Sequence, residues 1–338
     1  MKVLILGGSG HVGGRLLQIM AGDAQYRPTG ASRSAPSHGL PGIQFLQLNT
    51  CDVPALTQAL EGFDAVVNCV AGNAQSIAQG AQALVTAAQL AGYPRIIHLS
   101  TMSVYGRAEG TVREDATLSP ELGWYGRAKC EAEDSIRAYA RQGGSAVVLR
   151  PGCVFGSRSE LWVGRIARWL QAGRLGDLGA AGDGWSNLVH IDDVCKAVLA
   201  ALSLHIGAHE QPVFNLAAPD SPRWNTYFVD LSVALHCTPV KRITARQLKI
   251  DAYLAGPPLK VANLLFKRLH WPTSALPDCM PPGLTALWAQ HIRLDAAEAG
   301  RQLGLGWTTY VDGLQSSAAW AARSTTEPPI KGAAKWTR

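Results

Sequence analysis

The chain has 338 residues, of which 47% are hydrophobic and 17% charged, and its formal net charge at pH 7 is +6. This length and apolar content are enough for a sizeable buried core, either in one large domain or in a large and a small one. The positive charge is modest and forms no Lys/Arg cluster, which argues against a nucleic-acid partner.

The first predicted element is a strand at Lys2–Leu6, followed by a glycine-rich turn and a predicted helix over Val12–Met20. A glycine turn between a strand and a helix lets the backbone approach a pyrophosphate, which the free N–H groups and partial positive charge of the helix N-terminus attract. The cofactor-binding residues predicted in this turn are Gly7, Ser9, Gly10, His11, Val12 and Gly13.

The second predicted strand covers Arg27–Ser32, and Arg33 follows it. An acidic residue at this point accepts hydrogen bonds from the ribose 2′-hydroxyl of NAD, whereas an arginine suits the 2′-phosphate of NADP. We therefore expect NADP as the cofactor. NAD is the alternative if Arg33 is only a solvated loop residue.

Apolar strands and helices then alternate along the chain, which predicts an α/β fold with a Rossmann-type doubly wound parallel sheet. The further predicted strands are Ile43–Leu48, Ala65–Val70, Arg95–Leu99 and Ala146–Leu149, and the predicted helices are Val53–Leu60, Ser76–Ala91 and Leu122–Arg141. We expect a dinucleotide-binding region over residues 1–150 and a smaller, mainly substrate-binding lobe with returning sheet elements over 151–322. Residues 323–338 are expected to be a disordered tail.

Two segments carry residues suited to proton transfer. Tyr125 and Lys129 are four residues apart in a predicted helix and so share one face. A phenol titrates near pH ~10, and a neighbouring ammonium together with the charge of an oxidised nicotinamide is expected to lower that pKa. Thr101 follows the fifth strand, at the carboxyl edge where α/β sheets bind ligands, although Ser100 and Ser103 offer the same hydroxyl group. The predicted catalytic residues are Thr101, Tyr125 and Lys129.

Together these segments resemble the extended short-chain dehydrogenase/reductases, the NAD(P)-dependent epimerase/dehydratase type, from Met1 to about Trp320. The resemblance is carried by the glycine turn, Leu99–Gly106, Tyr125 with Lys129, Arg150–Gly156, Val189–Val194 and Phe214–Leu216. It implies a homodimer formed through the helices at 76–91 and 122–141. It adds cofactor contacts at Asn49, Thr50, Val70, Ala71, Pro151 and Val154. It adds substrate contacts at Asn73, Met102, Ser103, Arg158, Ser186 and Asn187.

Departures from the family pattern bear on the reaction. Sugar 4,6-dehydratases of the family have an Asp-Glu pair where this chain has Met102 and Ser103, so dehydration is not expected. Nucleotide-sugar epimerases usually have a diphosphate-binding arginine where this chain has Ser186. The arginines that offer a replacement are Arg158, Arg165 and Arg174.

We therefore expect hydride transfer between NADP(H) and a secondary alcohol or ketone of a small, hydrophobic or sugar-like substrate. An NAD-dependent nucleotide-sugar epimerase that retains its cofactor is the alternative, and a non-catalytic NADP sensor is less expected.

The remaining features are expected to be structural. Seven scattered cysteines lack the spacing of metal ligands, and no signal peptide or spanning segment is recognised, so we expect a cytoplasmic protein without a metal site. Asp192 or Asp193 is expected to cap the following helix, and His98 to lie in the core. The apolar and basic segment 254–271 is expected to pack on the substrate lobe. A lid over a hydrophobic substrate and a helix lying on a membrane are the alternatives.

Overall fold

The computed structural model describes residues 1–34, 42–119, 121, 123–207, 209–269, 271 and 277–324. The last helix, α12 (Tyr310–Ser324), includes the first two residues of the predicted tail, and the rest of the tail lies outside the described residues. Among the described helices, none combines the length and hydrophobicity needed to cross a bilayer.

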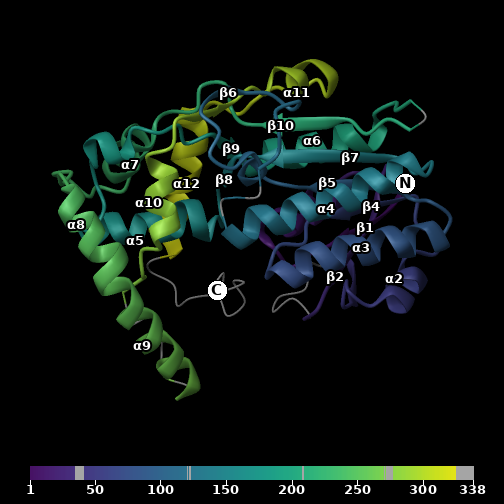
Figure 1. Cartoon of the computed structure of the whole chain (residues 1–338), viewed down its shortest axis with the longest axis horizontal. Coiled ribbons are helices and arrows are strands. Elements are labelled where there is room, and N and C mark those ends of the chain that lie inside the picture. The colour runs from purple at the N-terminus through teal and green to yellow at the C-terminus, as the bar shows by residue number, and fades with distance from the viewer. Residues whose placement is uncertain are drawn as a thin grey trace.

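The predicted parallel sheet is present, and its seven strands lie in the order β10-β7-β5-β4-β1-β2-β3. The pairings along this order are parallel, so the carboxyl ends of the strands lie at one edge (Figure 1). The chain runs outward in opposite directions from β1 and β4, which makes the gap between them the switch point where ligands bind in such sheets. The strands are β1 (Lys2–Leu6), β2 (Arg27–Ser32), β3 (Gln44–Gln47), β4 (Ala65–Asn68), β5 (Arg95–Leu99), β7 (Ala146–Pro151) and β10 (Val213–Leu216).

Helices cover both faces of this sheet because its strands are apolar on both sides. In β1, Val3 and Ile5 pack with one cluster, while Leu4 and Leu6 pack with the other. One face is covered by α1 (His11–Ala21) and α6 (Ile191–Ser203), and the other by α2 (Val53–Leu60), α3 (Ala74–Leu90) and α4 (Gly123–Arg141). The predicted helices and strands of this part are confirmed, with boundaries that differ by one or two residues.

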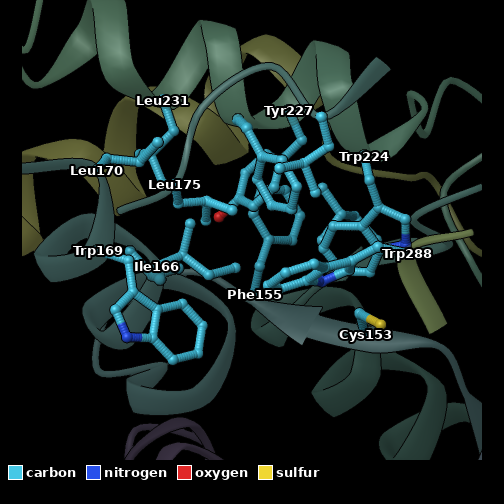
Figure 2. Packing of buried hydrophobic residues seen from close by; sticks show 14 of the residues in the cluster. Cys153, Phe155, Ile166, Trp169, Leu170, Leu175, Trp224, Tyr227, Leu231 and Trp288 are labelled. Carbon is cyan, nitrogen blue, oxygen red and sulfur yellow. The ribbon is translucent and has the colours of Figure 1, made fainter. Parts of the chain in front are cut away.

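A smaller lobe is built from later segments around its own aromatic core. Its centre is formed by Trp224, Tyr227 and Trp288, with Phe155 and Trp169 beside them (Figure 2). The lobe's helices are α5 (Arg165–Gln171), α7 (Trp224–Ala234), α8 (Ala245–Lys249), α9 (Gly256–Arg268), α10 (Pro282–Trp288) and α12, with short turns η1 (Met102–Tyr105), η2 (Glu160–Gly164), η3 (Gly179–Gly182) and η4 (Ile250–Ala255). The helix α11 (Ala297–Gln302) instead packs on the large sheet beside β10.

Two small sheets connect this lobe to the large sheet. One pairs β8 (Cys153–Phe155) with β9 (Leu188–His190), and the other pairs β6 (Gly110–Val112) with β11 (Ile292–Leu294). The loop after β5 and the C-terminal part of the chain therefore meet above the carboxyl edge of the large sheet.

Candidate active site

The glycine turn packs against the ends of the neighbouring strands. Gly7 has a φ of +78°, and a Cβ on it would lie 2.9 Å from the carbonyl oxygen of Cys69. A Cβ on Gly13 would collide with the carbonyl oxygen of Gly7, so the start of α1 lies directly on the turn. Residues with side chains cannot replace these two glycines without moving the backbone.

The N-terminus of α1 fits a dinucleotide pyrophosphate. Its N-cap, Gly10, supplies no side-chain hydrogen bond, whereas Asp52 and Asn73 cap α2 and α3 in this way. The first turn of α1 also contains no acidic residue. Within the described part of the chain, no side chain caps the N–H groups at the start of α1, and they lie at the carboxyl edge of the sheet, which suits a bound phosphate.

The predicted residues Thr101 and Tyr125 are brought together. Thr101 caps η1 just after β5, and the Tyr125 hydroxyl hydrogen-bonds to its side chain. Gly126, the residue after Tyr125, allows α4 to approach the loop after β5 closely. A Cβ on Gly126 would lie 2.8 Å from the Ser103 carbonyl oxygen. The glycine thus allows the start of α4 to rest on the loop that carries Thr101.

Lys129 is buried one turn further along α4, with 2% of its surface exposed. Its ammonium donates to the carbonyl oxygens of Leu99, at 2.7 Å, and Val70, at 3.3 Å. Burial lowers the pKa of Lys129 to about 8. These two carbonyls hold the amine at the ends of β5 and β4.

The expected lowering of the Tyr125 pKa by Lys129 does not occur in the protein alone. Burial raises the pKa of Tyr125 to about 12, and the hydrogen bond to Thr101 offsets part of this rise. The ammonium of Lys129 is directed to backbone carbonyls instead. In the protein alone the tyrosine is therefore a neutral hydroxyl at neutral pH, and it can accept a proton only once a nearby positive charge lowers its pKa.

The other predicted cofactor residues lie at the same edge in different environments. The Arg33 guanidinium approaches Gly72, after β4, and so extends over the end of β1, which lies between β2 and β4. His11 hydrogen-bonds to the Ser157 carbonyl oxygen at 3.0 Å, and burial lowers its pKa to about 4. Ser9 and Ala71 are exposed, Val12, Val70 and Val154 are partly buried, and Thr50 and Pro151 are buried. Asn49 is exposed and accepts a hydrogen bond from the N–H of Cys51.

Two of the predicted substrate residues are held inside the lobe. Ser186 is completely buried and bonds to Ser221 and to the Pro222 carbonyl oxygen. Asn187, 2% exposed, donates to the Ile292 carbonyl oxygen and accepts from the Leu294 N–H. The bonds of Asn187 attach β11 to the start of β9, and those of Ser186 attach the same segment to residues 221–222.

The other predicted substrate positions differ in accessibility. Asn73 is exposed and caps α3, Met102 is buried, and Ser103 accepts a hydrogen bond from Thr101. Among the three arginines offered as diphosphate ligands, Arg174 is ion-paired with Asp251 and Arg165 lies over the Trp169 ring. Arg158 is exposed, and no described residue forms an ion pair with it.

Sequence reasoning missed a buried polar network beside the site. Glu133, one turn after Lys129, forms an ion pair with Arg150 at 2.7 Å, and both side chains are at most 3% exposed. Glu133 also accepts a hydrogen bond from Ser100, the neighbour of Thr101. Arg150 donates to the Tyr105 hydroxyl, which donates to Asn215. The (i, i+4) spacing from Lys129 was a signal for Glu133, but nothing local pointed to its partner.

The predictions for His98, Asp192 and Asp193 agree with the structure only in part. His98 is buried in the core as predicted, and its Nδ1 lies 3.2 Å from the Asn68 amide. The prediction that Asp192 or Asp193 caps α6 was wrong, because His190 is the N-cap. Asp192 instead pairs with Arg15 of α1, and Asp193 accepts from Thr308. Both carboxylates therefore tie α6 to other segments.

This geometry defines a Rossmann-type dinucleotide-binding protein with a hydroxyl pair and a lysine at the carboxyl edge of its sheet. The model of the NAD dependent epimerase/dehydratase family matches residues 3–217, and the chain belongs to this family.

Characterised relatives include two kinds of enzyme. The chain is 27% identical over 268 residues to the N-acetyl-alpha-D-glucosaminyl-diphospho-ditrans,octacis-undecaprenol 4-epimerase of Escherichia coli O157:H7, a match that covers 75% of this chain and 77% of the relative. It is 32% identical over 216 residues to the 2'-dehydrokanamycin reductase of Streptomyces kanamyceticus, covering 60% of this chain and 58% of the reductase.

The structure also resembles a UDP-glucuronic acid 4-epimerase from Bacillus cereus in complex with NAD. The TM-score is 0.72, with 20% identity and complete coverage of both chains. At this identity the likeness shows the shared fold.

Proposed function

We propose that this protein is a sugar epimerase that inverts a secondary-alcohol carbon by oxidising it to a ketone and reducing it from the opposite face. The observation that carries the proposal is the hydrogen bond between Tyr125 and Thr101, one helical turn from the buried ammonium of Lys129. A bound nicotinamide supplies the hydride acceptor and, in the second half of the reaction, the hydride donor.

Each residue has a defined task in this reaction. Thr101 hydrogen-bonds to the substrate oxygen and orients it toward Tyr125. Tyr125 takes the hydroxyl proton as the ketone forms and returns it when the alcohol forms again, so no proton is gained or lost overall. Lys129 holds the ribose of the cofactor and, together with the nicotinamide charge, offsets the effect of burial on Tyr125.

The proposed substrate is a sugar carried on a diphosphate. The epimerase relative, which this chain matches over three quarters of its own length, acts on such a sugar attached to undecaprenol. Ser186 is buried where nucleotide-sugar epimerases of the family have a diphosphate-binding arginine, so a diphosphate-linked substrate needs another arginine in this chain. Arg158, exposed after β8, is the arginine we assign to the diphosphate.

A reductase is the second candidate, and Arg33 favours it. Its guanidinium extends across the end of β1, where an adenosine ribose is expected, and suits the 2′-phosphate of NADP. The reductase from Streptomyces kanamyceticus is a relative of comparable identity. We keep NADP as the proposed cofactor of such a reductase, while an epimerase that retains its cofactor uses NAD.

Whether the cofactor is consumed distinguishes an epimerase from a reductase. The purified protein is denatured to release and quantify bound nicotinamide, and the native protein is then tested with diphosphate-linked sugars and ketones in the presence of NADPH or NADH. An epimerase gives an inverted product without net change in absorbance of the reduced nicotinamide. Stoichiometric NADPH consumption with a reduced product would replace the epimerase by the reductase.

A Tyr125→Phe variant tests the mechanism in either case. Turnover is expected to fall by about a hundredfold or more, with cofactor affinity nearly unchanged, because only the proton donor is lost. Tyr26→Phe, far from the carboxyl edge, is the matched control and is expected to behave like wild type. Full turnover in Tyr125→Phe would refute the assigned role.

A further inference from the structure

The segment after residue 244 forms a helical arm that leaves the lobe. α8, η4 and α9 follow one another without a break over residues 245–268, and Figure 1 shows α9 extending beyond the rest of the lobe. The base of the arm is fixed by the buried side chains of Leu248 and Ala252 and by the ion pair between Asp251 and Arg174. A capping box at Thr244 begins the first helix.

The outer surface of the arm is apolar and exposed. In α9 and the turn after it, Val261, Leu264, Leu265 and Leu269 follow the i, i+3, i+4, i+8 spacing of one helix face, and each is more than half exposed. The prediction that this segment packs on the lobe is wrong for these side chains. Among the described side chains of the arm and its end, the large exposed apolar ones are Ile250, Tyr253, Leu254, Val261, Leu264, Leu265, Leu269 and Trp271.

Single exposed apolar residues are common, but a continuous stripe marks an interaction surface. Nearer the base of the arm, the outer face of α8 and η4 carries Arg246 and Lys249 beside the exposed side chains of Ile250, Tyr253 and Leu254. This face thus combines apolar side chains with two basic ones. This combination matches an amphiphile that has an anionic head and a hydrocarbon tail.

The charge of the arm points to the same partner. Residues 245–271 include five basic residues, Arg246, Lys249, Lys260, Lys267 and Arg268, and one acidic residue, Asp251. Asp251 is neutralised by Arg174 at the base of the arm. The arm therefore presents a net positive charge beside its apolar stripe, which complements an anionic bilayer.

A second copy of the chain is a poorer partner for this face. In a twofold dimer the same patch meets itself, so the basic residues of both arms would be brought together.

The aromatic side chains of Tyr253 and Trp271 lie toward the two ends of the stripe, and such side chains are favoured at the interface between lipid and water.

We propose that the arm of α8, η4 and α9 docks this protein on the surface of an anionic membrane, with the apolar stripe inserted among the lipids and the basic residues at the headgroups. Docking is independent of whether the enzyme is an epimerase or a reductase. It places the enzyme where a lipid-carried sugar is found, if the proposed substrate is correct.

The test is co-sedimentation of the full chain with vesicles. One set contains equal parts phosphatidylglycerol and phosphatidylcholine, and the other contains phosphatidylcholine alone. Wild type is expected to sediment with the anionic vesicles and to be released by high salt. Wild-type protein that stays in the supernatant with both sets overturns the proposal.

Two kinds of variant examine the apolar and charged parts separately. The double variant Leu264→Ser/Leu265→Ser is expected to bind anionic vesicles at least tenfold more weakly, because two inserted side chains are lost. Lys260→Gln and Arg268→Gln are each expected to weaken binding by about fivefold at low salt. The matched control, Val233→Ser/Val311→Ser, changes two similarly exposed residues on α7 and α12 and is expected to bind like wild type.

The alternatives give different results. Leu264→Ser/Leu265→Ser protein that still sediments like wild type would remove the stripe from the proposal and so overturn it. Sedimentation velocity without lipid distinguishes a second copy. If wild type is a dimer that does not bind the vesicles and the double variant is a monomer, the face is an interface between chains. Vesicle binding needs no turnover, so its failure and the failure of the proposed reaction are observed independently.

Discussion

Replacing Gly126 with alanine should move the Tyr125 hydroxyl away from the Thr101 side chain. The added Cβ would lie 2.8 Å from the Ser103 carbonyl oxygen, against 3.4 Å for an ordinary contact. The start of α4 must then move by about 0.6 Å from the loop that holds Thr101. Because Tyr125 is the preceding residue, its hydroxyl moves with the helix.

The expected cost can be divided between stability and turnover. Overpacking costs roughly 1–3 kcal/mol, and the better helix propensity of alanine returns about 1 kcal/mol, so the net loss of stability is about 0–2 kcal/mol. A displacement approaching 1 Å at a reacting group lowers turnover by up to about a hundredfold. Cofactor affinity is expected to change little, because the glycine turn is not touched.

Urea unfolding, steady-state kinetics and cofactor titration measure these three quantities. Gly283→Ala in α10 is the matched control, since a Cβ there meets nothing within 4 Å. It should leave turnover unchanged and raise stability by no more than ~1 kcal/mol. Wild-type turnover in Gly126→Ala would refute the idea that this glycine positions Tyr125.

Three further predictions concern buried charge and cofactor choice. Glu133→Gln leaves the buried Arg150 without its counter-ion and should lower the free energy of unfolding by about 3–5 kcal/mol. The control Asp134→Asn removes one partner of an exposed ion pair on the same helix and should cost less than ~1 kcal/mol. Equal losses of stability in urea unfolding would contradict this. The folded protein binds the proton of Lys129 less tightly than the unfolded chain does, because burial lowers the pKa of this amine to about 8. The free energy of unfolding of wild type, relative to that of Lys129→Met, should therefore rise by about 3 kcal/mol between about pH 8 and 10.5. A difference that does not change with pH would show that the amine is not desolvated. Arg33→Ala should weaken NADPH binding at least tenfold and leave NADH binding nearly unchanged; an equal loss for both would make Arg33 unrelated to the 2′-phosphate.

The parts predicted well from sequence are those fixed by short-range patterns. The glycine turn follows directly from strand β1, and Thr101 follows β5, so the common direction of parallel strands places both at one edge. Tyr125 and Lys129 share a face because they are four apart in a helix. No knowledge of distant contacts was needed for these positions.

The parts predicted poorly depend on contacts between distant segments. The resemblance places Ser186 and Asn187 among the substrate contacts, but only the fold shows that their neighbours at 221–222 and 292–294 bury them. The partner of Glu133 comes from β7, and no local spacing indicates that pair. For segment 254–271 the periodicity predicts an apolar face, yet only the fold shows that the lobe does not cover it.

The most direct test of the proposed epimerase uses N-acetyl-α-D-glucosaminyl diphospho-undecaprenol deuterated at carbon 4 of the sugar. The hydride removed from this carbon returns to it from the other face, so the inverted product should keep its deuterium while free NADPH is not consumed. Tyr125→Phe should give almost no product. Deuterium lost to water, or a product formed only with stoichiometric consumption of NADPH, would contradict the account.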